Sequence, residues 1–261
     1  MTFRIAQISD VHFGGENQAA VAAVAAYLAE TKVDLVVLAG DHTVQGRPGE
    51  FAAARAWIET LPAPRVITPG NHDTPYNAID RLISPFSRYE RALAPTGLPY
   101  WAGPDAALVS INTARGIQPR ANWSKGQISA RQTREAIGLL AGRQAGAMAA
   151  VVCHHPLTEM LGGPMTGRVW GGEAAARAFI EAGVDLILTG HIHAPFAMPL
   201  GLGDNRTYAV GSGTLSVRER GVAASFNLIE ATAETLSVLA VAWTGSHFEP
   251  WRSWAFPRRV L

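Results

Sequence analysis

The chain has 261 residues, of which 48% are hydrophobic and 16% charged, and its formal net charge is +1 at pH 7. That length suits one large domain or two small ones with a sizeable core. The near-neutral charge, without a long run of one sign, argues against a surface for nucleic acid or anionic lipid. The single cysteine, Cys153, excludes an internal disulfide, and in a presumed buried strand it is expected to be a core residue.

The first part of the chain alternates apolar runs with alanine-rich segments. We predict strands over residues 3–9, 35–39 and 65–68, and helices over 16–31 and 50–60. Such alternation is typical of parallel strands joined by right-handed helical crossovers. The expected fold class is therefore α/β with a largely parallel sheet.

The middle of the chain is less regular. We predict a helix over 79–93 interrupted at Pro85, a strand over 108–112, a helix over 128–143, a strand over 149–154, a helix over 173–182 and a strand over 184–191. Two long loops, 113–126 and 155–172, are rich in glycine, proline and polar residues. Long loops are uncommon in a compact domain unless they bind something.

The last third changes character. Residues 206–210, 223–230 and 236–243 resemble antiparallel strands, which we expect to form a second sheet stacked on the first. No linker composition divides the chain, so residues 1–261 are expected to form one domain. The tail 243–261 contains five large aromatic residues and is expected to be buried on its own domain or on another subunit of a homo-oligomer.

Five of the predicted strands end on aspartate, histidine or asparagine. These strand-end residues are Asp10 with His12, Asp41, Asn71 with His72, His154, and His191 with His193. The carboxyl ends of parallel strands meet at one edge of a sheet, and ligands bind there in open α/β folds. We therefore expect these side chains to lie close together.

Carboxylates combined with imidazoles suit borderline divalent ions such as zinc, iron or manganese, whereas magnesium or calcium would favour an all-oxygen set. The sequence offers more donors than one ion needs. Two ions about 3.5–4 Å apart can hold a bridging hydroxide and stabilise both ends of an in-line displacement at phosphorus. Hydrolysis of a phosphate ester is the reaction that uses such a pair.

Five motifs in order then carry a family resemblance: D-V-H at 10–12, G-D at 40–41, G-N-H-D at 70–73, H-H-P at 154–156 and G-H-I-H at 190–193. The set, which spans most of the chain, resembles the calcineurin-like metallophosphoesterase superfamily. Within it, the I-A-Q-I-S-D opening and the strand near G-S-G-T (211–214) resemble the bacterial class III cyclic-nucleotide and glycerophosphodiester phosphodiesterases.

The resemblance implies a four-layer αββα sandwich and two metal ions, Fe, Mn or Zn. It further implies that Asp10, His12 and His193 bind one ion and that Asn71, His154 and His191 bind the other. Asp41 would be the carboxylate shared by both ions, and His72 the catalytic histidine. The implied substrate is a small phosphodiester.

Other polar and aromatic residues near the strand ends are candidate substrate contacts. His42 departs from the family pattern; it either supports the metals or substrate, or turns away and bonds to backbone. Loop cations that could meet a phosphate are Arg115, Arg120, Lys125 and Arg168, and aromatic residues that could stack on a base are Tyr76, Trp123 and Trp170. Ordinary loop packing is the alternative for each, and His155 is expected behind the ligands.

Several functions fit these residues. The first is a two-metal phosphodiesterase, and the second is a binding scaffold of the same fold without chemistry. A nucleotide-linked pyrophosphohydrolase and a phosphomonoesterase are alternatives within the superfamily, whereas the charge disfavours a nuclease. No signal peptide or membrane-spanning run is recognised, so we expect a cytoplasmic protein.

Overall fold

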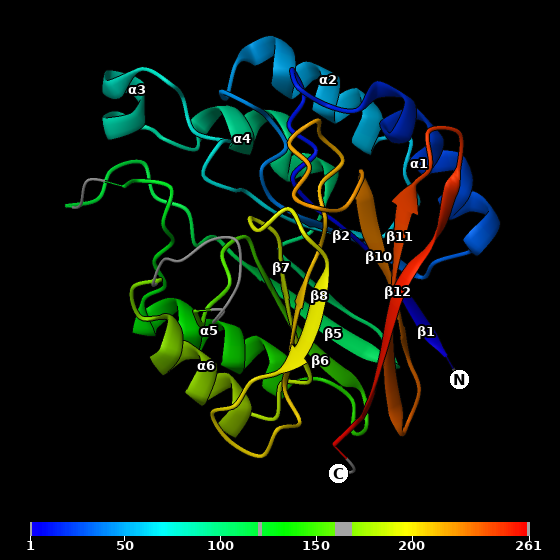
Figure 1. Ribbon diagram of the computed structural model, residues 1–261. Helices are drawn as coiled ribbons and strands as arrows, with labels where there is room; N and C mark the ends of the chain where they lie inside the picture. Colours follow the sequence, from blue (N-terminus) through cyan, green and yellow to red (C-terminus); the bar gives the residue numbers. More distant parts are fainter. Residues whose placement is uncertain (1, 120–121, 160–168, 260–261) are drawn as a thin grey trace.

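The computed structural model describes residues 2–119, 122–159 and 169–259. Two six-stranded mixed sheets pack against each other, and helices cover both outer faces (Figure 1). The first sheet has the order β12-β11-β10-β1-β2-β3 and the second β4-β5-β6-β7-β9-β8. The expected four-layer αββα sandwich is confirmed.

The strands of the first sheet are β1 (Phe3–Ile8), β2 (Leu35–Ala39), β3 (Arg65–Thr68), β10 (Ser225–Ala231), β11 (Thr235–Trp243) and β12 (Phe248–Pro257). Those of the second are β4 (Tyr100–Ala102), β5 (Ala106–Ile111), β6 (Met148–Cys153), β7 (Leu186–Thr189), β8 (Phe196–Pro199) and β9 (Tyr208–Gly211). The helices are α1 (Gln18–Thr31), α2 (Pro48–Ile58), α3 (Ala78–Ile83), α4 (Ser87–Ala92), α5 (Ala130–Ala141) and α6 (Gly172–Glu181), with a 3₁₀ turn at Ala94–Thr96.

The strands of the last third are divided between the two sheets. β9 pairs in parallel with β7, whereas β10 pairs antiparallel with β1, with Ile229 opposite Ile5. The prediction that 206–243 builds a separate sheet is therefore wrong. Strand partners are chosen by long-range packing: Ile5 and Ile229 both lie in the core between the sheets.

Three hydrophobic clusters correspond to the three interfaces between the four layers. β6 shows why the sequence folds this way, because successive residues of a strand face opposite sides. Met148, Ala150 and Val152 face the other sheet, whereas Ala149, Val151 and Cys153 face helices α5 and α6. A strand buried on both faces reads as a continuous apolar run, as this one does.

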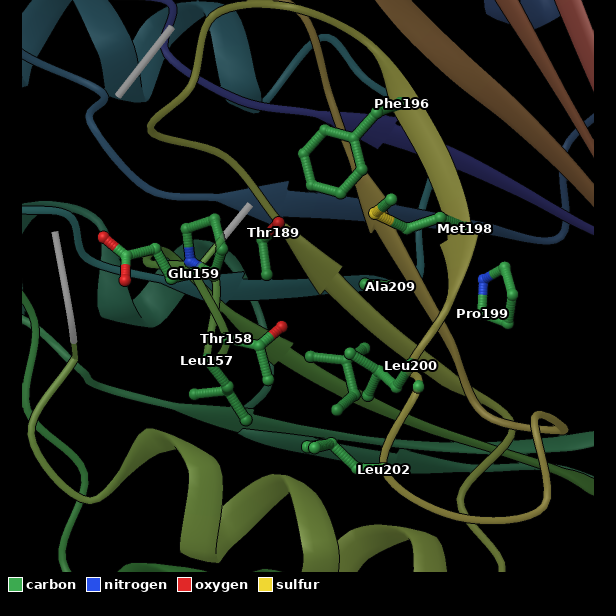
Figure 2. Close-up of a pocket in the computed structure, with 13 residues that line it drawn as sticks. Leu157, Thr158, Glu159, Thr189, Phe196, Met198, Pro199, Leu200, Leu202 and Ala209 are labelled. Carbon is green, nitrogen blue, oxygen red and sulfur yellow. The ribbon is translucent and has the colours of Figure 1, made fainter. Parts of the chain in front are cut away.

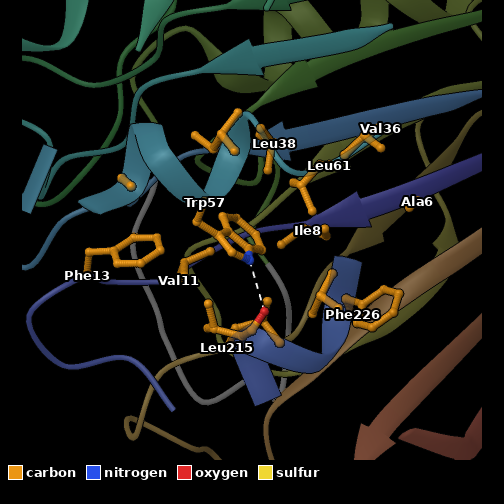
Figure 3. Close-up of a cluster of buried hydrophobic side chains, with 14 of the residues drawn as sticks. Ala6, Ile8, Val11, Phe13, Val36, Leu38, Trp57, Leu61, Leu215 and Phe226 are labelled. Atoms are coloured by element: carbon orange, nitrogen blue, oxygen red, sulfur yellow. Dashed lines mark hydrogen bonds between the residues drawn. The ribbon is translucent and has the colours of Figure 1, made fainter. Parts of the chain in front are cut away.

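The outer core of the first sheet is closed by α1 and α2 (Figure 3). Trp57 of α2 packs there, and its indole Nε1 donates to the Val21 carbonyl oxygen of α1 at 2.9 Å. This hydrogen bond ties the two helices together above the sheet. Together they support β1 and β2, whose ends carry Asp10 and Asp41.

The predicted helix over 79–93 is two helices. α3 ends before Ser84, which has φ −149° and ψ 63°, and α4 begins after Phe86. Proline disfavours helical backbone at the residue before it, so Pro85 separates the two.

The aromatic tail forms β12, the edge strand of the first sheet, which the sequence did not predict. Phe248 packs in the outer core, and Phe256 stacks on Tyr208 of the second sheet with ring centroids 4.4 Å apart. Pro250 pairs with Val241 beside a register shift in which Trp251 is the extra residue of β12, and an edge strand tolerates proline there. Phe248 and Phe256 of the tail are therefore packed within the chain, whereas Trp251 is 40% exposed, and oligomerisation stays a prediction. Within the described ranges, no helix is long and apolar enough to span a bilayer.

Candidate metal centre

The ends of β1, β2, β3, β6 and β7 bring the predicted ligands together. Four overlapping groups have ligand atoms within 4.8 Å of one another: Asp10, His12 and His193; Asp10, Asp41 and His154; His12, Asp41 and His72; and His154, His155 and His191. Nearly all of these side chains are buried. The prediction that the side chains at these strand ends lie close together is thus confirmed.

Backbone conformation marks the same residues. Asp10, His12, Asp41, His191 and His193 all have positive φ, between 52° and 70°. A left-handed conformation at a residue other than glycine costs of order 1 kcal/mol or more, and such residues cluster at functional sites. The sharp turns at the strand ends aim these side chains back towards one shared centre.

One carboxylate oxygen of Asp10 faces His12 and His193 without a hydrogen-bond partner. Its Oδ2 accepts from Ser9 Oγ at 2.6 Å and from the His191 amide at 2.9 Å. Its buried Oδ1 has no hydrogen-bond partner, although His193 Nε2 lies 3.1 Å and His12 Nε2 3.7 Å away. An orphaned carboxylate oxygen facing two imidazoles fits a cation.

Asp41 faces both groups. Its Oδ1 accepts from the His72 amide at 2.8 Å, and its Oδ2 lies 3.2 Å from His154 Nε2 and 3.8 Å from His12 Nε2. On the far side, His191 Nδ1 lies 3.3 Å from His154 Nε2. Asn71 adds a second buried oxygen, Oδ1, without a partner.

Three of the histidines are oriented by backbone carbonyls. Nδ1 of His12 lies 3.1 Å from the Thr43 oxygen, Nδ1 of His154 lies 2.8 Å from the Ala39 oxygen, and Nδ1 of His193 lies 2.9 Å from the Arg218 oxygen. Because a carbonyl only accepts, Nδ1 of each ring carries a proton, and Nε2 is the nitrogen that points to the centre and can bind a metal ion once it carries no proton. Metal-binding histidines are typically held this way.

The electrostatics of the centre favour positive charge. Burial opposes protonation of His154, but the Asp41 and Asp10 carboxylates raise its pKa to about 9. Burial lowers the pKa of His12 to about 4 and that of His191 to about 3, so these imidazoles are neutral donors. The pKa of Asp41 is lowered because its histidine neighbours outweigh burial. Ionised carboxylates, two orphaned oxygens, the neutral rings of His12 and His191 and a proton on His154 that a cation would displace together fit borderline metal ions.

Glycines allow the strand ends to approach this closely. A Cβ on Gly70 would lie 2.1 Å from Asp41 Oδ1, and one on Gly190 would lie 2.5 Å from Asp10 Oδ2. Neither distance leaves room for a methyl group, so Gly70 and Gly190 are required by packing around the two carboxylates.

His72 stands at the edge of this centre. Its Nδ1 lies 2.7 Å from the Val44 carbonyl oxygen, and its Nε2 lies 3.4 Å from Arg218 Nη1. The ring is half-buried and lines the cleft. Nε2 is therefore the His72 atom that can contact a molecule bound in the cleft.

Two adjoining cavities form the cleft. One, of about 400 Å³, is lined by candidate ligands together with Arg218, Glu219 and Arg220. The other, of about 290 Å³, is a side cavity that includes Tyr76, Trp123 and Arg81. The Arg81 guanidinium lies over the Trp123 ring, 5.6 Å from its centroid. Tyr76 and Trp123 are thus where the sequence placed them, on the rim.

Two predicted substrate contacts are corrected by the structure. His42 is 1% exposed, its Nε2 lies 3.0 Å from the Thr68 carbonyl oxygen, and its ring stacks on Tyr89, so it turns away from the cleft. The Arg115 guanidinium bonds to the Asn112 and Ala114 carbonyl oxygens and to a glutamine side chain. These hydrogen bonds stabilise the loop that carries Arg115, and the residue lines neither cavity.

The other candidates have different outcomes. His155 is buried, with Nδ1 2.9 Å from Thr113 Oγ1 and Nε2 2.7 Å from the Ser124 oxygen, so it lies behind the ligands as expected. Lys125 and Trp170 are not among the residues that line the two cavities. Arg120 and Arg168 lie outside the described residues.

Sequence reasoning missed two contributors. Asp73 is buried and accepts from the amides of His42, Thr43 and Gly70, which fixes the loops carrying Asp41 and Asn71. Its place in G-N-H-D was the available signal. Arg218 was missed because the R-E-R run at 218–220 follows G-S-G-T and lies far in sequence from the ligand motifs.

A separate apolar cavity of about 340 Å³ lies beside β7, β8 and β9 (Figure 2). Phe196, Met198, Leu200 and Leu157 are among its lining residues, and none of the candidate ligands is among them. The chemistry-bearing cleft is therefore the one at the strand ends.

The chain belongs to the calcineurin-like phosphoesterase family, whose model matches residues 3–195. This membership supports a metal-dependent hydrolase, in agreement with the clustered histidines and aspartates. A probable cyclic nucleotide phosphodiesterase of Synechococcus sp. is 38% identical over 84 residues, which cover 29% of this chain and 33% of that protein. The match thus spans only about a third of the relative.

Solved structures share the fold over nearly the whole chain. A dimetal phosphatase from Danio rerio has a TM-score of 0.70 and 12% identity, covering 98% of this chain and 99% of that one. The structure of PhoD has a TM-score of 0.72 and 12% identity, covering 98% and 70%. At such low identity the likeness establishes the architecture alone.

Proposed function

We propose that the chain hydrolyses small phosphodiesters, of the cyclic-nucleotide or glycerophosphodiester type, with two metal ions at the strand ends. The position of Asp41 carries the proposal. Its Oδ2 lies within 3.8 Å of imidazole nitrogens from both donor groups, His12 Nε2 on one side and His154 Nε2 on the other. This position supports the proposal that two ions share the carboxylate.

In this proposal the ligand sets are Asp10, His12 and His193 for one ion, Asn71, His154 and His191 for the other, and Asp41 for both. Iron, manganese or zinc suits these donors. When bound, the ions would supply Lewis-acid activation of the phosphoryl group and of the nucleophile.

His72 performs the proton transfer in this proposal. The Val44 carbonyl holds its ring, so that Nε2 faces the cleft beside the ligands. Because Nδ1–H donates to the Val44 carbonyl, the acid is the imidazolium form of His72: its Nε2 gives a proton to the oxygen of the leaving alcohol and the ring becomes neutral. General acid catalysis of this kind contributes roughly 10²–10⁴-fold.

The side cavity supports a diester over a monoester. It joins the metal cavity at Asn71 and His72, and Tyr76 and Trp123 offer aromatic surface in it. A phosphate with a second organic substituent can place that substituent there, and a planar base would stack on the rings. The name of the Synechococcus relative points the same way.

A substrate panel tests the proposal. Protein loaded with Mn²⁺ is assayed with bis(4-nitrophenyl) phosphate, 4-nitrophenyl phosphate, 3′,5′-cyclic AMP, glycerophosphocholine and a nucleotide-linked pyrophosphate. We expect kcat/KM for diesters to exceed that for the matched monoester at least about tenfold, the effect of 1.4 kcal/mol of extra binding. A higher monoester or pyrophosphate rate would replace the proposal with that activity, and metal-loaded protein without turnover would indicate a scaffold.

A further inference from the structure

The loop between β9 and β10 is anchored to the candidate metal centre. Thr214 Oγ1 donates to the Asp10 carbonyl oxygen at 2.6 Å, and Ser216 Oγ lies 2.7 Å from Thr214 Oγ1. Ser216 Oγ in turn accepts from the Arg218 amide at 3.2 Å. The Arg218 carbonyl oxygen in turn accepts a hydrogen bond from Nδ1 of His193. The backbone of Arg218 is therefore fixed relative to two candidate ligands.

The Arg218 side chain crosses the cleft towards His72. A guanidinium has five N–H donors, and within the described part of the chain its only side-chain partner is His72 Nε2, 3.4 Å from Nη1. Arg218 is exposed, and among the described residues its side chain pairs with no carboxylate. Apart from Nη1, the guanidinium N–H groups have no acceptor among the described residues and are available to a ligand.

Arg218 also stands at the junction of the two cavities, since it lines both. A diester with phosphorus at the ligands and a substituent in the side cavity would place its phosphoryl group beside this guanidinium. Arg220 lines only the metal cavity, and Glu219 supports the loop by accepting from the Ala224 amide at 3.1 Å. Arg218 is the cation with access to both parts of the substrate.

We propose, resting on the proposed function, that Arg218 binds a non-bridging phosphoryl oxygen of the substrate and of the phosphate product. A guanidinium matches such oxygens in geometry and forms short charge-assisted hydrogen bonds with them. It offsets the negative charge that Asp41 brings to the same cavity. Arg218 is therefore a substrate-binding residue.

A purely positioning role, in which Arg218 only orients His72, makes a different prediction. Loss of the side chain would then change the dependence on the leaving group but leave phosphate affinity unchanged. Phosphate binding is consequently the decisive readout.

The experiment compares Arg218→Ala and Arg218→Lys with Arg134→Ala, which removes an exposed arginine of α5. Metal content and Tm are measured first and should equal those of the wild type, because the Arg218 carbonyl is retained. The inhibition constant of inorganic phosphate and kcat/KM for bis(4-nitrophenyl) phosphate follow. For Arg218→Ala we expect each to worsen about 10- to 100-fold, the loss of one charge-assisted hydrogen bond. Arg218→Lys should recover part of the loss, and Arg134→Ala should show none.

Unchanged phosphate inhibition in Arg218→Ala would overturn the inference, whatever happens to turnover. Loss of metal in both Arg218 variants would also overturn it, because the residue would then act through the ligands. Failure of the proposed function is distinguishable, since wild-type protein would then lack diester turnover while phosphate binding could still be measured by calorimetry.

Discussion

Gly70→Ala should disable the centre although it adds a single methyl group. The new Cβ would lie 2.1 Å from Asp41 Oδ1 and 2.4 Å from the Asp41 amide nitrogen, whereas real contacts of this kind are at least 3.0 Å. Something must therefore move by about 1 Å. Gly70 cannot easily retreat, because its amide donates to Asp73 Oδ2 at 2.9 Å. Asp41, backbone and carboxylate together, is therefore what moves, and with it the group proposed to be shared between the ions.

A displacement of about 1 Å in a catalytic group costs roughly 10²-fold in rate, and overpacking costs about 1–3 kcal/mol in stability. The assay is diester kcat/KM with metal content by mass spectrometry and Tm. The matched control is Gly138→Ala in α5, where a Cβ meets nothing within 4 Å. That variant should be fully active and slightly more stable, because alanine favours helix by roughly 1 kcal/mol. Wild-type rate and metal content in Gly70→Ala would refute the reasoning.

Three further predictions concern other parts of the chain. His72→Ala should retain its metals while kcat for alkyl diesters falls roughly 10²–10⁴-fold, with a smaller loss for nitrophenyl esters; equal losses would favour a binding role. Cys153 should react with a disulfide reagent at pH 8 far more slowly in the native than in the unfolded protein, because burial raises the pKa of its thiol to about 12; similar rates would contradict its placement in the core. Deleting residues 248–261 removes Phe248 from the outer core, so we expect aggregated, metal-poor protein by light scattering; a dimer converted into a soluble active monomer would instead identify a subunit interface.

The sequence predicted the strands of the site well because their signal is local. An apolar run closed by glycine and a polar residue specifies both a buried strand and its end, and the strand over 65–68 has the predicted bounds. The meeting of Asp10, Asp41 and His154 follows from parallel strands sharing an edge. Their assignment to particular ions remains part of the proposal.

What the sequence could not provide depends on long-range contacts. β12 contains prolines and alternates poorly, and only its pairing with β11 makes it a strand. Side-chain direction in loops is equally non-local: His42 follows a ligand but turns to the Thr68 carbonyl, and Arg115 bonds to its own loop. Arg218 reaches His72 from 146 positions along the chain, which no motif spacing reveals.

A metal titration tests the central claim most directly. Protein stripped with a chelator is titrated with Mn²⁺ while hydrolysis of bis(4-nitrophenyl) phosphate is recorded. Because Asp41 faces both donor groups, the account predicts a rate that stays low at one equivalent of metal per chain and reaches its maximum at two. A maximum at one equivalent, or hydrolysis that survives chelation, would contradict the two-metal phosphodiesterase.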